Sequence, residues 1–315
     1  MMLKLFPHVS KQTNLRCVTA LLQKRTVTQS SFPPQPVRRG GKTVWETQKG
    51  ARNFIISLDR SLEPLKAFPL AEKTFPGAIS NPDLVSKVSS ILSSRMFTPA
   101  NTLLATSLCC DELARELEYD FTTVYGKNFN LGGLSGFPFA GRTGFGAMAA
   151  HVPDDGYCLV VHGPHVGITE DGIIGKVERS GIALVDTCCG SAIAASNYLK
   201  GITEGGAEIR TNIQSFTDFQ QGAVQELILP HGKRLSSAEN RMVELPYALY
   251  ESQDLLIREI ISKGSSGIKK GLALLGGIQV NTGPKTNDYF VPLRFDYMNS
   301  EGTLVENLLP ELTKK

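Results

Sequence analysis

Two strand-like apolar runs in this chain each end directly in a pair of cysteines, and this pattern restricts both the fold and the chemistry. The first run, residues 102–108, leads into Cys109, and the second, residues 182–187, leads into Cys188 and Cys189. Ligands of open α/β sheets bind in the crevice beyond the carboxyl ends of the strands. We therefore expect an α/β fold, with a mostly parallel open sheet flanked by helices and a thiol-containing site at one edge.

The segment before the first cysteine pair has the alternation of a helix and a strand. Asn81 and Pro82 are typical of a helix start, with Asn as the cap and Pro in the first turn. Apolar residues then recur on one helical face up to residue 92, and Thr98-Pro99 ends the helix before the strand at 102–108. The segment thus predicts the first helix-then-strand unit of the sheet.

The carboxyl-terminal third has the composition of a scaffold. Helical periodicity runs through residues 216–229 and again through 236–263, where a capping box begins the second helix. Residues 271–284 and 288–297 have the pattern of two adjacent strands joined by a turn of glycine and proline. The run at 182–187 is expected to be a further buried strand.

The charge of the chain is concentrated at its start. The formal net charge is +3, but residues 1–45 contain eight Lys or Arg and no Asp or Glu. The remaining residues therefore carry −5, the difference between +3 and +8. Residues 1–45 lack the apolar core of a secretory signal, so we expect an organelle transit peptide, mitochondrial rather than plastid. The alternative is a disordered basic arm that contacts nucleic acid or anionic lipid.

Length and hydropathy bound the rest of the molecule. A chain of 315 residues with 41% hydrophobic and 20% charged residues is long enough for one sizeable core. No apolar run approaches the roughly 18 residues that cross a bilayer, so no membrane span is expected. We expect residues 46–80 to wrap around a single domain formed by residues 81–315, and we expect no nucleic-acid partner for this domain.

The residues around the first cysteine pair predict a catalytic metal site. Cys109 supplies a thiolate at a strand end, and Asp111 supplies a carboxylate two residues on. If the following residues open a helix, Asp111 and Arg115 lie four apart on one face and can pair. A histidine from another segment would complete the set, either His151, at the end of a short helix, or His165, in a strand-end loop. The residues alone leave both open.

Residues 131–156 are rich in glycine and phenylalanine. They contain seven glycines, and Phe137, Phe139 and Phe145 are interleaved among them. The spacing differs from GxGxxG and lacks the lysine of a phosphate loop, so nucleotide binding is not indicated. We expect the three rings to form an apolar wall over a small-molecule pocket.

Several stretches, taken in order, resemble one known family. They are FTPANTLLATSLCCDEL, LGGLSGFPFAGRTGFGAMAAHVPDDG, GPHVGI, CCGSA and LLGGIQVNTGPKTNDYFVPLRFD, spread over about residues 80–310. This set is similar to the limiting-CO2-inducible B proteins of algae and diatoms, which have a β-carbonic-anhydrase-like fold and a zinc site. The resemblance implies Zn2+ as cofactor, with Cys109, His151 and Cys189 as ligands.

The resemblance also implies the acidic group of the site. Cys109, rather than Cys110, keeps the Cys-x-Asp step of β-carbonic anhydrases with Asp111, and Cys189 keeps their Cys-Gly step. The arginine that those enzymes carry two residues after the Asp is Leu113 here. Arg115 is the expected replacement. The substitutes considered for it are Arg95 and Arg142.

The implied activity is reversible hydration of CO2 to bicarbonate by zinc-bound hydroxide. Two thiolate ligands would make the metal a weaker Lewis acid than three imidazoles, so activity is expected to be best on the alkaline side. Two other functions stay open. One is a catalytically silent zinc-bearing homologue that acts as a CO2- or bicarbonate-handling assembly partner, and the other is a thiol or redox enzyme. Related folds pair into dimers, so a homodimer is expected.

Overall fold

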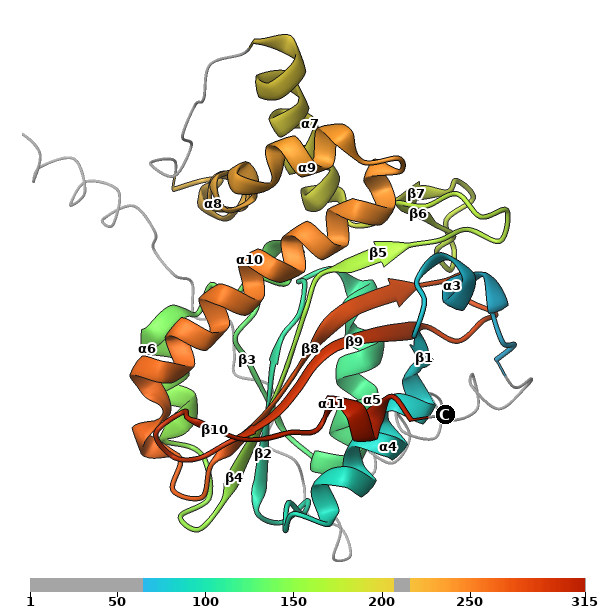
Figure 1. The fold of residues 1–315 in the computed structure, drawn as a ribbon. Coiled ribbons are helices and arrows are strands. Elements are labelled where there is room, and N and C mark those ends of the chain that lie inside the picture. The colour runs from blue at the N-terminus through green and yellow to red at the C-terminus, as the bar shows by residue number, and fades with distance from the viewer. Residues whose placement is uncertain (1–64, 207–215, 315) are drawn as a thin grey trace, which may run out of the picture. The chain divides into compact units, whose positions relative to one another are not determined.

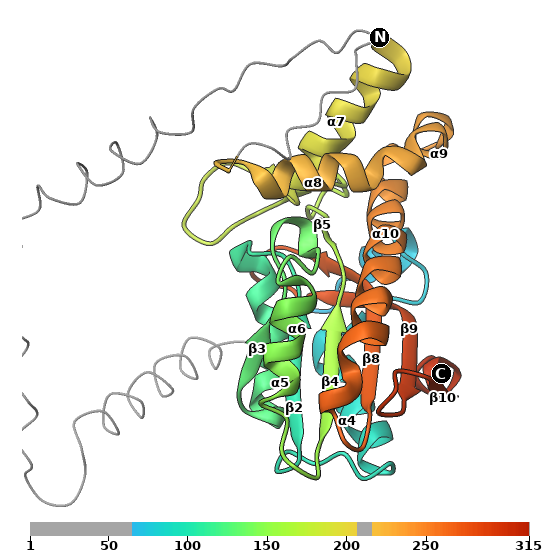
Figure 2. The same ribbon diagram turned by 90° about the vertical axis from the view of Figure 1, so that its left-hand side faces the viewer.

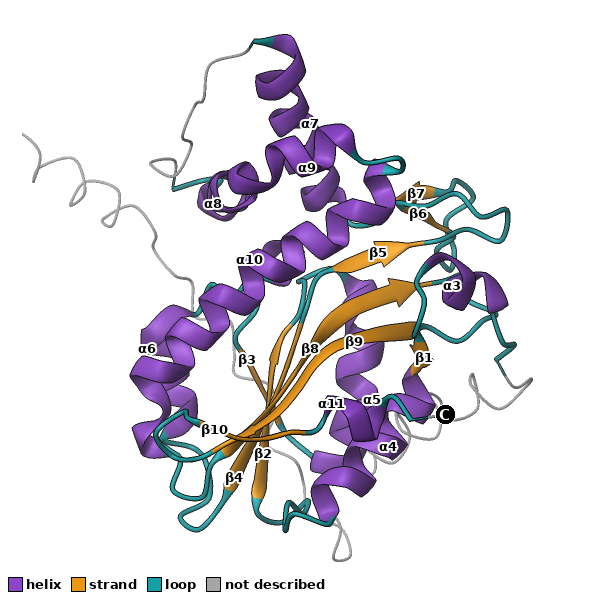
Figure 3. Cartoon of the chain, viewed as in Figure 1, coloured by secondary structure: helices purple, strands orange, loops and turns teal. Residues whose placement is uncertain are grey.

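The structure, a computed structural model, describes residues 65–206 and 216–314. The predictions for residues 1–45 and for residues 46–64 lie outside the described part. The described residues contain one large sheet, coloured orange in Figure 3, with helices on its faces. Among them no helix combines the length and the hydropathy that a membrane span requires.

The large sheet has eight strands in the order β1-β9-β8-β4-β2-β3, with β10 added to β9 and β5 added to β8 (Figure 1). The strands are β1 (Ile79–Ser80), β2 (Thr102–Ser107), β3 (Asn128–Asn130), β4 (Tyr157–His162), β5 (His165–Gly167), β8 (Leu272–Asn281), β9 (Tyr289–Met298) and β10 (Leu304–Asn307). Strands β3, β2, β4 and β8 pair in parallel, and so do β5 and β8, whereas β9 is antiparallel to β8, β1 and β10. The predicted fold class, a mostly parallel open sheet flanked by helices, is confirmed.

The helices that the structure describes range from 4 to 24 residues in length. They are α3 (Pro69–Thr74), α4 (Asn81–Ser93), α5 (Arg115–Tyr125), α6 (Gly141–Ala149), α7 (Gly190–Gly205), α8 (Phe219–Ile228), α9 (Gly232–Ser237), α10 (Arg241–Gly264) and α11 (Leu309–Leu312). Helices α6 and α10 run along the sheet together, as Figure 2 shows, and α4 packs with α5.

The central strand β4 is buried along its whole length, because helices cover both faces of the sheet. Leu159 and Val161 join the buried cluster that also contains the apolar faces of α4 and α5. Cys158 and Val160 point the other way and join the cluster formed by α6 and α10. This two-sided burial explains why the strand reads as a continuous apolar run rather than an alternating one.

Helix α4 follows the sequence prediction with a shift of one residue at its cap. The cap is Ser80, whose hydroxyl oxygen accepts a hydrogen bond from the Asp83 backbone N–H, and Pro82 stands in the first turn. The long helix predicted from residue 236 begins later. Asn240 caps α10 by accepting hydrogen bonds from two backbone N–H groups, and residues 232–237 form the separate α9.

The prediction of a buried strand at residues 182–187 is wrong. Only β7 (Asp186–Thr187) is extended, and it pairs with β6 (Lys176–Val177) in a separate two-stranded sheet. Leu184 is 78% exposed, and its apolar neighbours are exposed as well. The run is therefore not part of the large sheet, in which β4 lies between β2 and β8.

Candidate metal centre

Two thiols and one imidazole converge beyond the carboxyl edge of the sheet. Cys109, His165 and Cys189 each offer one ligand atom, and these atoms lie within 4.8 Å of one another. The residues are 2%, 2% and 4% exposed, so the group is buried. Among the residues that the structure describes, no other group of three or more His, Cys, Asp or Glu side chains has its ligand atoms close enough to hold a metal ion.

The parallel pairing of β2 with β4 brings the first two residues together. Thr102 lies opposite Tyr157, and Ser107 lies opposite His162, so the two strands end at the same edge. Cys109 comes two residues after the end of β2. His165 comes three residues after the end of β4, beyond the Gly163-Pro164 turn. Cys189 is the N-cap residue of α7, and its Sγ atom lies 3.9 Å from that of Cys109.

The structure does not bring His151 into this group, which corrects the ligand set expected from the resemblance. His151 follows α6 and precedes β4, so it lies at the amino end of the strand whose carboxyl end leads to His165. Its side chain is exposed, and its ring lies 5.8 Å from that of Phe129. His165, the alternative from the strand-end argument, occupies the place instead.

The dimensions of the group fit a zinc ion. In a tetrahedral site with Zn–S bonds of about 2.3 Å, two sulfurs stand about 3.8 Å apart. The Sγ atoms of Cys109 and Cys189 are 3.9 Å apart. One imidazole and two thiols form a three-residue donor set of the kind that suits catalytic zinc.

A buried nitrogen without a protein partner supports the same fit. Nε2 of His165 is buried and has no hydrogen-bond partner, whereas Nδ1 lies 2.9 Å from Oδ1 of Asn281. Leaving a buried polar atom unpaired costs about 1–3 kcal/mol, so such atoms require an explanation. A metal ion at Nε2 would provide one.

The thiols are electrostatically coupled. A hydrogen bond to Cys189 and burial both raise the pKa of the Cys109 thiol. The same hydrogen bond lowers the pKa of Cys189 against the opposing effect of burial, and the neighbouring His165 adds to the lowering. These shifts favour a thiolate at Cys189 and a protonated thiol at Cys109. Binding of a divalent ion would favour deprotonation of Cys109 as well.

Asp111 lies at the edge of the group and stays ionised. Its Oδ2 is 3.9 Å from Nε2 of His165, and Arg179 donates to both of its oxygens, at 3.2 and 3.3 Å. Burial is the largest single influence and would raise the pKa of Asp111. Hydrogen bonds with Arg179, Glu112 and the Leu113 N–H, together with the nearby His165, outweigh it and bring the pKa down to about 2. Asp111 also caps the turn at residues 112–114 by accepting from the Leu113 N–H.

Arg115, the expected partner of Asp111, lies elsewhere. It starts α5 and pairs with Glu118, and it also donates to the carbonyl oxygen of Cys109. Asp111 and Arg115 do not share a helical face, because the intervening residues form a 3-10 turn. The substitutes are elsewhere too. Arg95 pairs with glutamates of the carboxyl-terminal segment, and Arg142 lies in α6.

Sequence reasoning missed Arg179 and Asn281. Arg179 lies 68 residues from Asp111, between β6 and β7, and no local spacing connects the two. Asn281 could have been found, because it lies near the carboxyl end of the strand predicted at residues 271–284, and it is the last residue of the observed β8. Polar residues at that position face the crevice of an open α/β sheet.

Comparison with known proteins agrees with the geometry. Residues 78–299 match the family model described as limiting CO2-inducible proteins B/C beta carbonic anhydrases. The crystal structure of PtLCIB4, a homolog of the limiting CO2-inducible protein LCIB, is 44% identical, with a TM-score of 0.71. The match covers 76% of this chain and 98% of that one. A search of curated proteins found no match.

The crystal structure of the limiting CO2-inducible protein LCIB itself has the same fold. It is 19% identical with a TM-score of 0.59, and the match covers 74% of this chain and 96% of that one. The family model spans more than two thirds of the 315 residues, including all three side chains of the candidate metal centre. The chain therefore belongs to the family of limiting CO2-inducible proteins B/C beta carbonic anhydrases.

Proposed function

We propose that this protein is a zinc-dependent carbonic anhydrase that interconverts CO2 and bicarbonate. The observation that carries the proposal is the convergence of Cys109, His165 and Cys189 in one buried group at the carboxyl edge of the sheet. Family membership supports it, because the family description names β-carbonic anhydrases. His165 takes the ligand role that the resemblance had given to His151.

The side chains of the centre have distinct tasks in this reaction. Zinc, when bound, lowers the pKa of a coordinated water to about 7, so that hydroxide is available near neutral pH. Asp111 presents an ionised carboxylate beside Nε2 of His165 and can accept a hydrogen bond from the nucleophile. Arg179 engages both carboxylate oxygens, which keeps Asp111 from serving as a further metal ligand.

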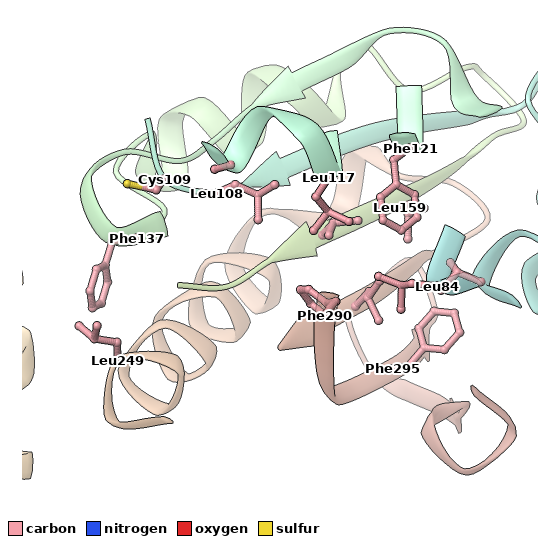
Figure 4. Close-up of a cluster of buried hydrophobic side chains, with 14 of the residues drawn as sticks. Leu84, Leu108, Cys109, Leu117, Phe121, Phe137, Leu159, Leu249, Phe290 and Phe295 are labelled. Carbon is pink, nitrogen blue, oxygen red and sulfur yellow. The ribbon is translucent and has the colours of Figure 1, made fainter. Parts of the chain in front are cut away.

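Apolar side chains beside the cysteines suit a substrate as apolar as CO2. Leu108 and Phe137 belong to the same buried cluster as Cys109 and Cys189, and Figure 4 shows Leu108, Cys109 and Phe137 near one another. Phe139 packs against this cluster. Only two of the three expected rings belong here, because Phe145 lies in the α6–α10 cluster on the other face.

Zinc stoichiometry measured together with stopped-flow CO2 hydration tests the proposal. The wild type is expected to bind one zinc per chain and to hydrate CO2, and Cys109→Ser to lose both. Cys110→Ser is the matched control, because Cys110 is adjacent but exposed. Zinc without turnover would support the silent assembly partner instead. Absence of zinc with fast alkylation of Cys189 would support a thiol enzyme.

Two further proposals concern the whole protein. We propose a homodimer, supported by the exposed apolar run between β6 and β7, where Ile182, Leu184 and Val185 are 53%, 78% and 43% exposed.

We also propose mitochondrial import, supported by the basic composition of residues 1–45. A fusion of residues 1–45 to a fluorescent protein tests the second; an unlocalised signal would contradict it.

A further inference from the structure

The tautomer of His165 depends on what lies at its inner nitrogen. A neutral imidazole carries its proton on one nitrogen, and a metal binds the other. Two side chains contact Nδ1: the Oδ1 atom of Asn281 at 2.9 Å and the Sγ atom of Cys188 at 3.4 Å. An acceptor at Nδ1 leaves Nε2 free for a metal. A donor at Nδ1 would place the proton on Nε2 and block it.

The amide of Asn281 can be oriented from its other contacts. Its Nδ2 lies 2.8 Å from Oδ2 of Asp288 and 3.3 Å from the carbonyl oxygen of Leu113. Both of these are acceptors, so the NH2 group must face them, and Oδ1 must face His165. Asn281 itself is fully buried, so its amide depends on these protein contacts.

The same orientation controls Cys188, whose thiol is a weak donor. Its Sγ lies 3.6 Å from Oδ1 of Asn281, so the S–H has an acceptor other than the imidazole. Oδ1 of Asn281 thus receives two donors, the Nδ1–H of His165 and the Cys188 thiol.

Asp288 in turn is held by the turn between β8 and β9. Its Oδ1 accepts a hydrogen bond from the Thr282 backbone N–H at 2.7 Å, and its carbonyl oxygen accepts from the Asn81 N–H. A chain of hydrogen bonds therefore runs from the backbone of the β8–β9 turn through Asp288 and Asn281 to His165. Each link has one donor and one acceptor.

We propose that Asn281, anchored by Asp288, is the positioning residue of the metal centre, which selects the His165 tautomer with a free Nε2 and keeps Cys188 from reversing it. The proposal rests on the metal centre proposed above and not on its turnover. Outer partners of metal-binding histidines typically change metal affinity 10–100-fold when they are removed.

Three variants of the full chain test this role. Asn281→Leu keeps the volume and removes the acceptor. Gln279→Leu is the matched control. Gln279 also lies on β8, and its side chain also donates a hydrogen bond to the Leu113 carbonyl oxygen, but that side chain forms no hydrogen bond with the His165 ring. The double variant Asn281→Asp, Asp288→Asn exchanges the amide and the carboxylate. Position 281 then still offers an acceptor to Nδ1 of His165, and the hydrogen bond between positions 281 and 288 is kept with its direction reversed.

Two readouts separate positioning from a merely structural effect. The first is the Zn2+ dissociation constant at pH 8, measured by competition with a chromophoric chelator. The second is the set of nitrogen chemical shifts of the His165 ring in metal-free protein, followed across pH so that the neutral ring is the form compared, which reports the tautomer without any metal or activity. Circular dichroism and thermal unfolding establish that each variant is folded.

We expect Asn281→Leu to weaken zinc binding about 10–100-fold and to move the ring proton toward Nε2. The exchange variant should recover at least most of the affinity, and Gln279→Leu should resemble the wild type. Unchanged affinity and tautomer in folded Asn281→Leu would overturn the proposal, and so would an exchange variant no better than Asn281→Leu. A wild type that binds zinc but lacks CO2 hydration would contradict the proposed function alone.

Discussion

Arg179 donates hydrogen bonds to both carboxylate oxygens of Asp111, with N–O distances of 3.2 and 3.3 Å, although it lies 68 residues further along the chain. We expect Arg179→Gln to lower CO2 hydration at least 10-fold while leaving zinc content unchanged. The reason is that an unrestrained Asp111 can turn toward the metal and occupy the open position. Stopped-flow hydration combined with metal analysis of the same preparation measures both quantities.

A control for this variant is Arg95→Gln. Arg95 also binds two carboxylates, those of Glu306 and Glu311, and neither it nor these glutamates belong to the group of three donor residues. Its loss should leave hydration within about 2-fold of the wild type, because surface ion pairs contribute little. Equal losses of activity in both variants would show that Arg179 has no special role.

The pKa of Asp111 predicts a pH-dependent contribution to stability. The folded protein depresses this pKa from 3.8 to about 2, so the carboxylate stabilises the fold above pH 4, and the effect disappears as the pH falls toward 2. Such a depression is worth about 2 kcal/mol at neutral pH. Urea unfolding of metal-free wild type and Asp111→Asn should therefore differ by about that amount at pH 7 and by less at pH 3.

Asp154→Asn is the reference for the pH experiment, since Asp154 is exposed in a turn before β4. Its free energy of unfolding should track that of the wild type at both pH values. If the Asp111→Asn difference were the same at pH 7 and pH 3, the ion pair with Arg179 would not be its cause.

The two histidines considered as ligands make opposite predictions. His165→Ala should abolish tight zinc binding, because it removes the imidazole of the convergent group. His151→Ala should keep full zinc content, because that side chain is exposed at the amino end of β4. Inductively coupled plasma mass spectrometry of the two purified variants decides between them. Zinc lost from His151→Ala and kept in His165→Ala would reverse the assignment.

Self-association can be tested at the exposed apolar run of the β6–β7 hairpin. Leu184→Glu should shift the protein from dimer to monomer in sedimentation velocity, because a charge cannot be buried there without a partner. Leu255→Glu is the comparison, since Leu255 is also an exposed leucine, 64% accessible, but lies on α10. Dissociation by Leu255→Glu alone would place the contact on α10 instead.

Local signals in the sequence were sufficient for much of the scaffold. Pro82 and the apolar face behind it correctly predicted α4, and the Gly-Pro turn correctly predicted the strand pair β8 and β9. These elements are set by residues near one another in the chain, through capping, periodicity and turn chemistry. The thiols at the ends of residues 102–108 and before α7 were likewise located from neighbouring residues.

The errors share a different physical origin. The run at residues 182–187 is apolar enough for a strand, but strand pairing in the sheet is non-local, and β8 from the far end of the chain takes the place beside β4. His151 and His165 lie within 14 residues of each other in sequence, and only the direction of β4 separates them. Arg179 reaches Asp111 through a hairpin whose position no spacing rule encodes.

The order of the donors along the chain has a consequence for biosynthesis. A nascent polypeptide that has emerged from the ribosome only as far as α10 already contains Cys109, His165 and Cys189. It still lacks β8, and with it the Asn281 amide that contacts His165. Metal capture would then be a late event in maturation, and a product truncated before residue 272 would hold zinc poorly despite having every ligand.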